Sequence, residues 1–434
     1  MAPLDPTLDP ETVFSALHRP GAPALFFDGR GGHDGSWPCR CAIEPRLSFM
    51  WGASPADPAS AMDRLDALVA RRRAAGGPGG TGIAMLCAYE AFAPRPGAPD
   101  DGWGVIGLEV DAVVAFDPGG APEARGRVEL VDRTARTLDR RSAARPSDRV
   151  PAAASERPRT SLGRDAYLSA VSRVKRHIAA GDIYQANLTQ RFDAACAAEP
   201  WALYRALAAS TPAPRSAYLE VPGLALASVS PEIFVDADAE GRVETRPIKG
   251  TRRREPTPED DARAAAELLA SEKDRAELVM IVDVLRNDLG RIARTGSVEV
   301  PELLALRSYA AVHHLVARVV AELRPDVTPG GLVAAVFPGG SITGAPKERA
   351  VELLRAIEPC PRGFYTGCLF WFDDDGSMAS SILIRSAVVT GGRAYVGAGG
   401  GVVADSDPEA EWSEANAKAR ALTRALGFEP EEAA

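Results

Sequence analysis

Residues 216–250 read SAYLEVPGLALASVSPEIFVDADAEGRVETRPIKG, and this stretch is the strongest indication of the fold class. It contains strand-length apolar runs separated by Gly and Pro turns, at residues 216–221, 224–229, 233–236 and 243–248. Consecutive strands with few helices between them favour antiparallel pairing. We therefore predict an α+β fold and not a doubly wound parallel sheet.

The flanking sequence supplies more strands and several helices. Further strands are predicted at residues 183–192, 367–372, 381–390 and 394–397, and helices at residues 165–180, 259–289 and 407–426. Residues 134–165 are rich in Arg, Ala, Ser and Pro and poor in large apolar side chains, which is typical of a connector or surface loop. We therefore expect an N-terminal portion over residues 1–133, this connector, and a catalytic body over residues 166–430.

The composition excludes several classes of protein. With 434 residues, 46% of them hydrophobic, and a net charge of −9, the chain is an ordinary globular protein whose acidity argues against nucleic acid as the main partner. It contains no apolar run of about 18 residues that could span a membrane, and its N-terminus, MAPLDPTLDPETV, is unlike a signal peptide. The six cysteines are too sparse for a disulfide scaffold. We expect a cytoplasmic protein with no membrane partner.

Lysine is rare in this chain, and its rarity draws attention to Lys249. Only five of the 50 basic residues are lysines, at positions 175, 249, 273, 347 and 418. Unlike a guanidinium group, an amine can lose its proton when it is desolvated and then act as a nucleophile. Lys249 lies between a strand-like run and an arginine cluster, and burial and nearby cations both lower the pKa of an amine. On composition alone, a turn lysine with no chemical role is the stronger interpretation.

Two of the predicted helices each carry carboxylates at positions i and i+3, a spacing that places both on one helix face. The pairs are Asp274 with Glu277, and Glu411 with Glu414. Two such faces brought together would form an oxygen-only site that suits Mg²⁺. Solvated acidic faces are the alternative. However, Glu277 directly precedes the apolar run LVMIV (278–282), and a buried carboxylate needs a cation.

Further features suit an anionic ligand. The glycine-rich segment at residues 397–401 lets a ligand approach the backbone, whose N–H groups can bind a carboxylate. The segment GGSITGAPK (339–347) leads into a predicted helix and suits anion binding, but it lacks the Ser or Thr that follows the lysine of a nucleotide-binding P-loop. Arg385, inside an apolar strand, suits a bidentate carboxylate, and His314 is a candidate polar contact. The structural alternatives are a ligand-free turn, an internal ion pair and a buried histidine.

Eight stretches of the chain, in family order, resemble the chorismate-utilising enzymes. This family includes anthranilate synthase component I, aminodeoxychorismate synthase component I, and the isochorismate and salicylate synthases. The stretches cover roughly residues 160–426 and read GDIYQANLTQRF (181–192), SPEIF (230–234), RPIKGT (246–251), KDRAELVMIVDVLRNDLGR (273–291), HHLV (313–316), GGSITGAPK (339–347), ILIRSA (382–387) and GAGGGVVADSDPEAEWSEANAKA (397–419). The resemblance implies an antiparallel β-sheet sandwich flanked by helices. The N-terminal third resembles the family only loosely.

Two positions relate the chain to branches of that family. Isochorismate and salicylate synthases carry a water-activating lysine where this chain has Gln185, so the resemblance argues against water addition. Anthranilate synthases usually read Pro-Ile-Ala-Gly-Thr where this chain reads Pro-Ile-Lys-Gly-Thr, and lysine at that place is typical of aminodeoxychorismate synthase. Lys249, which the lysine count singles out, is therefore also the residue that separates these two branches.

The resemblance implies a role for each candidate residue. Lys249 would attack C2 of chorismate, and Glu232 would be the general acid for the departing 4-hydroxyl. Glu277 and Glu414 would hold Mg²⁺, with Asp274 and Glu411 in support. The substrate contacts carried over from the family are Arg385, Gly399, Gly400, Gly401, Thr343, His314 and Lys347.

The activity implied by the resemblance is the conversion of chorismate and ammonia to 4-amino-4-deoxychorismate, a step of para-aminobenzoate and folate synthesis. A glutamine amidotransferase subunit would supply the ammonia. Anthranilate synthase component I, which releases pyruvate from chorismate, is the alternative within the family. A non-catalytic ligand-binding homologue is an alternative of a different class, and it predicts no loss of function when Lys249 is replaced.

Overall fold

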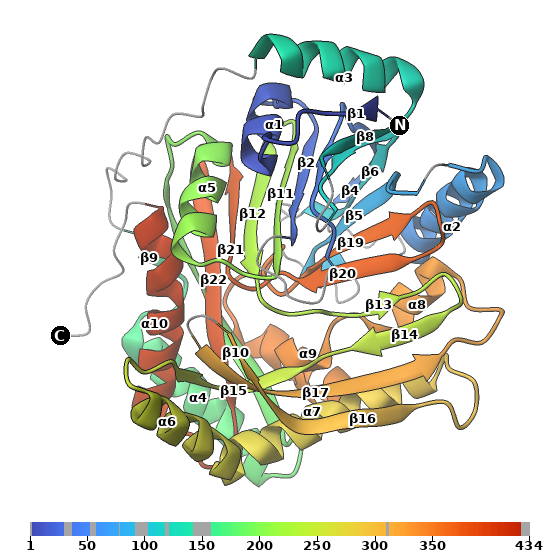
Figure 1. Cartoon of the computed structure of the whole chain (residues 1–434). Helices are drawn as coiled ribbons and strands as arrows, with labels where there is room; N and C mark the ends of the chain where they lie inside the picture. Colours follow the sequence, from blue (N-terminus) through green and yellow to red (C-terminus); the bar gives the residue numbers. More distant parts are fainter. Residues whose placement is uncertain are drawn as a thin grey trace.

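Two large sheets form the body of the protein (Figure 1). The computed structural model describes residues 2–29, 37–52, 58–77, 79–91, 103–117, 121–141, 158–309 and 312–426. Within these ranges the first sheet has 12 strands, in the order β1 (Ala2–Pro3), β8 (Glu123–Gly126), β7 (Ala112–Ala115), β3 (Arg40–Ala42), β2 (Ala24–Asp28), β11 (Arg215–Val221), β12 (Leu224–Ser230), β21 (Ser386–Thr390), β22 (Arg393–Val402), β10 (Gln185–Ala195) and β18 (Gly344–Ala345), with β9 (Arg159–Thr160) beside β10.

The second sheet has ten strands within the same ranges. Their order is β15 (Ile248–Arg253), β17 (Val312–Glu322), β14 (Arg242–Thr245), β13 (Asp236–Ala237), β20 (Met378–Ile382), β19 (Cys368–Asp373), β5 (Gly82–Cys87), β6 (Trp103–Val110) and β4 (Arg46–Gly52), with β16 (Glu299–Ser308) beside β17. Neighbouring strands run antiparallel, for example β11 with β12 and β19 with β20. The prediction of an α+β fold built on antiparallel sheets is confirmed.

The stretch 216–250 contributes to both sheets. β11 and β12 pair as a hairpin in the first sheet, while β13, β14 and β15 belong to the second. The segment between β12 and β13 therefore carries the chain from one sheet to the other. Glu232 lies in this crossing segment, which explains how a residue between two strands comes to lie inside the molecule.

Helices cover the outer faces of the two sheets (Figure 1). They are α1 (Pro10–Leu17), α2 (Pro58–Ala74), α3 (Val128–Arg141), α4 (Arg164–Ala179), α5 (Pro200–Ser210), α6 (Pro258–Ala270), α7 (Glu272–Gly290), α8 (Pro329–Val336), α9 (Lys347–Ile357) and α10 (Pro408–Ala425), with short 3₁₀ helices η2 (Tyr89–Ala91) and η3 (Gly340–Ile342). The helical region predicted over residues 259–289 consists of two helices, α6 and α7, separated at Ser271. Ser271 ends α6 and also begins α7, where its hydroxyl accepts a hydrogen bond from the Asp274 N–H.

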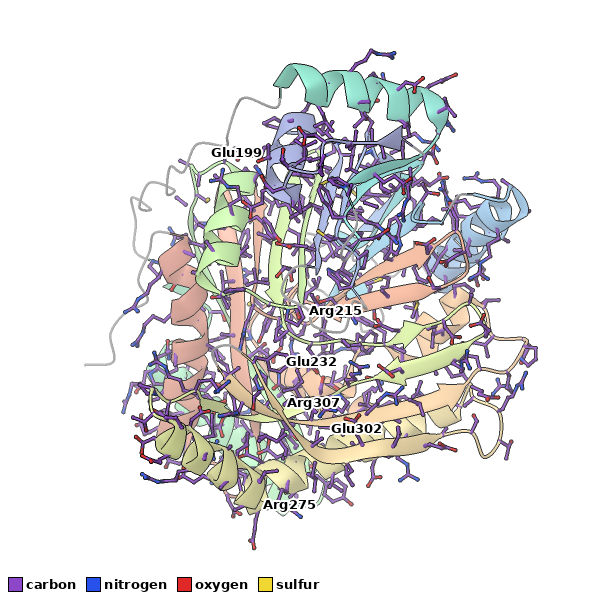
Figure 2. The ribbon with its side chains drawn as sticks, viewed as in Figure 1. Glu199, Arg215, Glu232, Arg275, Glu302 and Arg307 are labelled. Atoms are coloured by element: carbon purple, nitrogen blue, oxygen red, sulfur yellow. The ribbon has the colours of Figure 1, made fainter. Side chains whose placement is uncertain are left out.

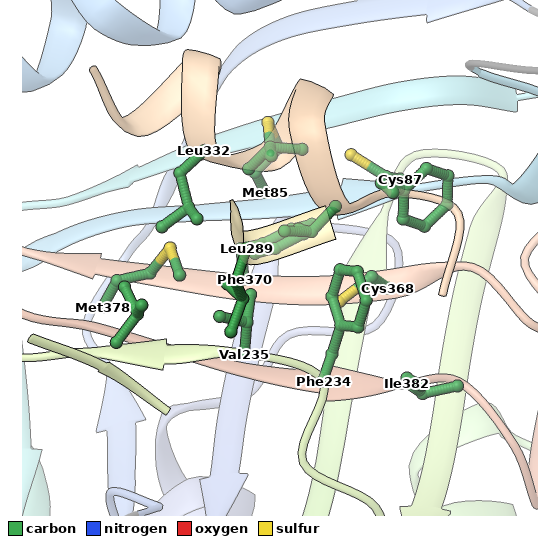
Figure 3. Packing of buried hydrophobic residues seen from close by; sticks show 14 of the residues in the cluster. Met85, Cys87, Phe234, Val235, Leu289, Leu332, Cys368, Phe370, Met378 and Ile382 are labelled. Carbon is green, nitrogen blue, oxygen red and sulfur yellow. The ribbon is translucent and has the colours of Figure 1, made fainter. Parts of the chain in front are cut away.

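Apolar side chains fill the space between the sheets and the layers outside them. Leu25, Leu226 and Leu369 belong to the cluster between the two sheets. On the outer face of the second sheet, Phe370 packs in one cluster with Leu289 of α7 and residues of α8 (Figure 3). Among the described residues, the structure contains no helix with the length and apolar composition of a membrane span.

The N-terminal portion contributes strands to both sheets. β2 pairs with β11 in the first sheet, and β5 pairs with β19 in the second. The connector predicted over residues 134–165 begins inside α3, because Val131, Thr134 and Leu138 form a buried stripe at helical spacing. The remainder of that connector, up to residue 157, lies outside the described residues.

Elements of both sheets meet at one end of the molecule. There β22 pairs with β10 and contacts α10, while α7 contacts β15 and β17. The candidate site residues lie on these elements and on the segments between them.

Candidate active site

Lys249 lies on β15 at a bulge in the second sheet. β15 pairs with β17, and the register shifts directly after Lys249 because Gly250 is an extra residue. Gly250 has a φ of +70°, and a Cβ there would lie only 2.9 Å from Cγ of Asp274. Burial lowers the pKa of Lys249, while the nearby carboxylates Glu277 and Glu232 act to raise it. A lowered pKa increases the neutral, nucleophilic fraction of the amine.

Glu232 is the candidate acid, and it is only 7% exposed. Figure 2 shows it toward the middle of the molecule. Burial raises the pKa of Glu232, although a hydrogen bond from Ser341 and the charge of Lys249 act to lower it. The Ser341 hydroxyl donates that bond to Oε1 of Glu232 over 2.8 Å. A shielded carboxyl group with a raised pKa suits proton donation near neutral pH.

The carboxylates of α7 and α10 lie close enough to affect one another. Burial raises the pKa of Glu277, and Asp274 and Glu411 act in the same direction. Burial also raises the pKa of Glu411, and Glu414 again adds to the rise. Acidic groups that raise one another's pKa favour a bound cation, because the cation removes their mutual repulsion.

Basic side chains partly neutralise these carboxylates. Lys418 pairs with Glu414 at 2.7 Å and, against the effect of burial, lowers the pKa of that group, while Lys273 lies 3.9 Å from Glu277. Among the described residues, no three His, Cys, Asp or Glu side chains already form a cluster that could hold a metal ion. The donor chemistry nevertheless fits Mg²⁺, which takes carboxylate oxygens and keeps several waters. The metal role of the four carboxylates stays a prediction.

Arg385 and His314 lie near each other at the same site. Arg385 has a φ of +51° in the segment between β20 and β21, and burial lowers the pKa of its guanidinium group. No ion pair or hydrogen bond of that guanidinium is found within the described ranges, so it is suited to bind a carboxylate from a ligand. Burial lowers the pKa of His314 to about 4, and Arg385 contributes to this effect. His314 is therefore neutral near pH 7, with Nδ1 lying 3.0 Å from Oγ1 of Thr251.

The glycine-rich part of β22 permits close approach by its neighbours. A Cβ on Gly400 would lie 2.9 Å from Oε2 of Glu411, and a Cβ on Gly401 would lie 2.2 Å from Nε2 of Gln185. The Gly399 carbonyl accepts a 3.1 Å hydrogen bond from Lys418. The predicted glycines therefore lie between Gln185 and the acidic helix α10, which is consistent with a need for side-chain-free backbone.

From the sequence, Gln185 served only as a position that separates branches of the family and was not predicted to contact the substrate. It is fully buried, and neither its amide nitrogen nor its amide oxygen has a hydrogen-bond partner within the described part of the chain. Buried amides are normally hydrogen-bonded, so these two atoms are suited to a ligand. Gly401 on β22 is the signal that could have identified it, because a Cβ at that residue would lie 2.2 Å from the amide nitrogen of Gln185.

Two predicted substrate contacts have partners within the protein. Thr343 is fully buried, and its hydroxyl donates a 2.8 Å hydrogen bond to the Gly339 carbonyl. Lys347 forms a 2.5 Å ion pair with buried Asp288 and donates to the Val336 carbonyl. These side chains stabilise the turn and the start of α9, because their polar atoms are already satisfied inside the protein. We therefore leave both out of the proposed substrate site.

Three residues near the site were not identified as site residues from the sequence. Ser341 contacts Glu232, and Lys418 contacts Glu414 and Gly399, as described above. Lys418 is one of only five lysines, so the lysine count that identified Lys249 contained the signal for it as well. The ring of Tyr365 lies 2.1 Å from where a Cβ on Gly397 would be, and burial raises the pKa of its hydroxyl to about 12.

Comparison with known proteins gives a consistent result. The model of a family described as chorismate binding enzyme matches residues 69–424. Aminodeoxychorismate synthase of Streptomyces griseus is 46% identical over 263 residues, which cover 61% of this chain and 36% of that protein. Anthranilate synthase component 1 of Bacillus caldotenax is also 46% identical, over 260 residues that cover 60% of this chain and 51% of that protein. Aminodeoxychorismate synthase component 1 of Bacillus subtilis (strain 168) is 44% identical over 268 residues, 62% of this chain and 57% of that protein.

The matches therefore span about a third to three fifths of these relatives, and their identities do not separate the two activities. Solved structures extend the similarity of fold to nearly the whole chain. Anthranilate synthase component I from Streptococcus pneumoniae TIGR4 superposes with a TM-score of 0.77 at 24% identity, covering 89% of this chain and 92% of that chain. MenF, the menaquinone-specific isochorismate synthase from Escherichia coli, superposes with a TM-score of 0.76 at 17% identity, covering 98% and 92%.

Proposed function

Because the chain belongs to the chorismate binding enzyme family, whose model covers residues 69–424, we propose that it converts chorismate and ammonia to 4-amino-4-deoxychorismate. This is the reaction of aminodeoxychorismate synthase component I. The observation that carries the proposal is the pairing of an amine with a lowered pKa, Lys249, and a buried acid with a raised pKa, Glu232, close enough to affect one another. These are the two groups that a covalent lysine route requires.

Substrate binding would use the Arg385 side chain, backbone N–H groups of β22 that do not bond to β10, and the ring of His314. The Arg385 guanidinium would donate two hydrogen bonds to a carboxylate of chorismate. Backbone N–H groups of Gly399 to Gly401 would bind an anionic oxygen, and neutral His314 would offer its Nε2 to a hydroxyl or ether oxygen. These contacts would orient the ring with C2 toward Lys249.

Glu277 and Glu414, supported by Asp274 and Glu411, would hold Mg²⁺ through their carboxylate oxygens. When bound, the ion would neutralise these carboxylates and a carboxylate of the substrate, which lets like charges share one site. Lys273 and Lys418 lie beside Glu277 and Glu414. With Mg²⁺ bound, these lysines would neutralise less of the carboxylate charge.

The chemistry would proceed in two balanced substitutions. The neutral Lys249 amine forms a bond to C2, the two ring double bonds shift, and the C4–O bond breaks, with Glu232 supplying the proton with which the hydroxyl leaves as water. The attached nitrogen releases one proton to become a secondary amine. Ammonia then bonds to C4 and loses one proton, the double bonds shift back, and Lys249 leaves C2 after regaining its proton. The enolpyruvyl ether stays intact, so no pyruvate is released.

The ammonia would come from a glutamine amidotransferase subunit. Relatives from Bacillus subtilis and Escherichia coli are named component 1, which implies a second component in those systems. The nucleophile in this chemistry is a small neutral molecule, so ammonium salts would replace the partner in a test reaction at alkaline pH.

Product analysis tests the proposal directly. The purified chain is incubated with chorismate, Mg²⁺ and ammonium, and the quenched protein and products are analysed by mass spectrometry. We expect 4-amino-4-deoxychorismate without pyruvate, and an adduct on Lys249 with the mass of chorismate less water. A Lys175→Arg variant, altered at a lysine on α4, is the matched control and should form the same adduct.

Anthranilate synthase is the second candidate, because a relative with that activity is as similar as the aminodeoxychorismate synthases. It predicts fluorescent anthranilate and one pyruvate per turnover in the same incubation. That product pattern would replace our proposal.

A further inference from the structure

A chain of hydrogen bonds fastens the strand that carries Lys249 to its surroundings. His313 on β17 is almost fully buried, and its two ring nitrogens both have partners. Nε2 lies 3.0 Å from Oδ1 of Asp261 on α6, and Nδ1 lies 2.7 Å from Oγ of Ser308 on β16. An ionised carboxylate can only accept, so Nε2 donates to Asp261 and Nδ1 is left to bond with Ser308.

Asp261 is the hub of this network. Besides His313, it accepts hydrogen bonds from Nε of Arg254, at 2.8 and 3.0 Å, and from the backbone N–H of Glu255 at 3.0 Å. The bonds from Arg254 and Glu255 lower the pKa of Asp261, so it stays ionised at neutral pH. Arg254 also donates to the Tyr309 carbonyl over 3.0 Å. One carboxylate thus connects α6, the segment after β15, and both strands of the β16–β17 hairpin.

The network lies directly beside the candidate chemistry. In the β15–β17 register, His313 is opposite Arg252 and His314 is opposite Thr251, two residues beyond Lys249. The ring of Tyr309 packs edge-on against the ring of His314, with centroids 5.6 Å apart. His313 is therefore adjacent to His314, and Tyr309, whose carbonyl accepts a hydrogen bond from Arg254, packs against the His314 ring.

The need for such an anchor follows from the shape of β15. This strand is six residues long, pairs with β17 alone among the described strands, and contains a bulge at Gly250. A short edge strand with a bulge has few ladder hydrogen bonds to hold it, so its position depends on contacts beyond the ladder. Asp261 supplies those contacts just past the end of the strand.

We propose that Asp261 is a positioning residue for the reaction: through His313 and Arg254 it fixes the bulged strand β15 and the β16–β17 hairpin, and so holds the Lys249 amine and the His314 imidazole in their reactive arrangement. The inference rests on the proposed function for its catalytic consequence, but its structural part stands on the network alone. In this proposal Asp261, His313 and Arg254 affect the reaction without contacting the substrate.

The first test replaces Asp261 with Ala and uses Asp260→Ala as its matched control. Asp260 is the preceding acid of the same helical turn and bonds only to Thr257 and Arg263 among described contacts. For Asp261→Ala we expect kcat with chorismate and ammonium to fall roughly 10- to 100-fold, because small displacements of reacting groups have effects of that size. The KM for chorismate should change less than about threefold, since Arg385 and the carboxylates lie on other elements.

Hydrogen exchange gives a readout that does not depend on activity. Amides of β15 and of the β16–β17 hairpin should exchange faster in Asp261→Ala than in the wild type or in Asp260→Ala, while β10 and β22 keep their protection. If the wild-type product turns out to be anthranilate, the proposed function fails, yet this exchange measurement still decides whether Asp261 anchors β15.

A pair of His313 variants separates the anchor from simple packing. The side-chain amide of Gln can place its nitrogen where Nε2 donates to Asp261, whereas the amide of Asn reaches only the Nδ1 position, toward Ser308. We expect His313→Gln to keep most of kcat and His313→Asn to lose it as Asp261→Ala does. Equal kcat in these two variants, or wild-type kcat and exchange in Asp261→Ala, would overturn the proposal.

Discussion

The Ser341 hydroxyl donates a 2.8 Å hydrogen bond to Oε1 of Glu232, a carboxyl group that is 7% exposed. Residue 341 follows the glycine pair before α9, and residue 232 lies where the chain crosses between the two sheets. Burial raises the pKa of Glu232, and this hydrogen bond acts in the opposite direction because it stabilises the charged form. These two effects, together with the charge of Lys249, which also lowers this pKa, set the pH range in which Glu232 carries a proton.

Removing the Ser341 hydroxyl should move the activity profile to higher pH. In Ser341→Ala the carboxylate loses a donor, so the pKa of Glu232 rises further. Glu232 must be protonated to act, and the alkaline limb of kcat/KM should therefore shift upward. The profile is measured at constant free ammonia, with Ser172→Ala on α4 as control. A limb that stays in place or moves down would contradict the role of Glu232 as the acid.

Replacing Glu232 with Gln should lower activity and raise stability. Loss of a general acid typically lowers the rate by about 10²- to 10⁴-fold. The folded-state pKa of Glu232 is raised, so its ionisation destabilises the fold as pH rises above the unfolded-state value of about 4.3. Urea unfolding should show the variant more stable by about 1 kcal/mol at pH 8, with the difference vanishing near pH 4. Equal unfolding free energies of the wild type and the variant at pH 8 would argue against a buried Glu232 whose ionisation destabilises the fold.

Lys249→Arg keeps a positive charge but removes the nucleophile. A guanidinium group does not lose its proton, so amination at C4 should fall by several orders of magnitude, and no adduct should form on the chain. Stopped incubations followed by intact-mass analysis measure both effects. Wild-type rate and product in this variant would remove the covalent role of Lys249.

Lys347→Met should affect stability more than catalysis. Lys347 and Asp288 form a buried ion pair with side chains 13% and 2% exposed, and removing one partner leaves a buried charge. The free energy of unfolding should fall by about 3 kcal/mol, with KM for chorismate unchanged, and a second change, Asp288→Leu, should recover part of the loss. A large rise in KM with normal stability would instead restore Lys347 as a substrate contact.

Glu277→Gln should weaken the response to Mg²⁺. The variant loses one anionic ligand, so the Mg²⁺ concentration that gives half-maximal activity should rise by at least about tenfold. Glu352→Gln, at an exposed glutamate on α9 paired with Arg349, is the control for a lost surface charge. The same Mg²⁺ titration in the wild type and in Glu277→Gln would exclude this carboxylate as a ligand.

Local pattern predicted much of this molecule correctly. Strand-length apolar runs between Gly and Pro turns identified β11 and β12 in the stretch 216–250, and both strands are buried along their whole length. The break at Ser271 was not predicted within the helical region 259–289, although the Ser271 hydroxyl caps α7 by accepting a hydrogen bond from the Asp274 N–H. The sequence also provided no prediction of α3, which extends into the first residues of the predicted connector, because the buried face of this helix is narrow and lies among many charged residues.

The site was predicted less evenly. Lys249 was proposed for its residue type, the acidic pairs for their spacing and Glu232 through the family resemblance, and the roles of all of them stay predictions. Thr343 and Lys347 were assigned to the substrate on the strength of their motif, whereas the fold satisfies them with the Gly339 carbonyl and Asp288. Sequence offers no sign of such pairing, since Asp288 is 59 positions away from Lys347 along the chain.

The amino-acid sequence alone therefore determined the types of group available: an amine among arginines, two acidic helix faces, an arginine within an apolar stretch and a glycine-rich strand. Only the tertiary structure decided their state, because pKa, burial and hydrogen-bond partners depend on contacts between residues far apart in the chain. Lys249 and Lys347 are the same residue type, yet the fold leaves one beside a buried acid at a strand bulge and neutralises the other in an ion pair. The physical reason is that the environment, which only folding creates, sets the free energy of each charged form.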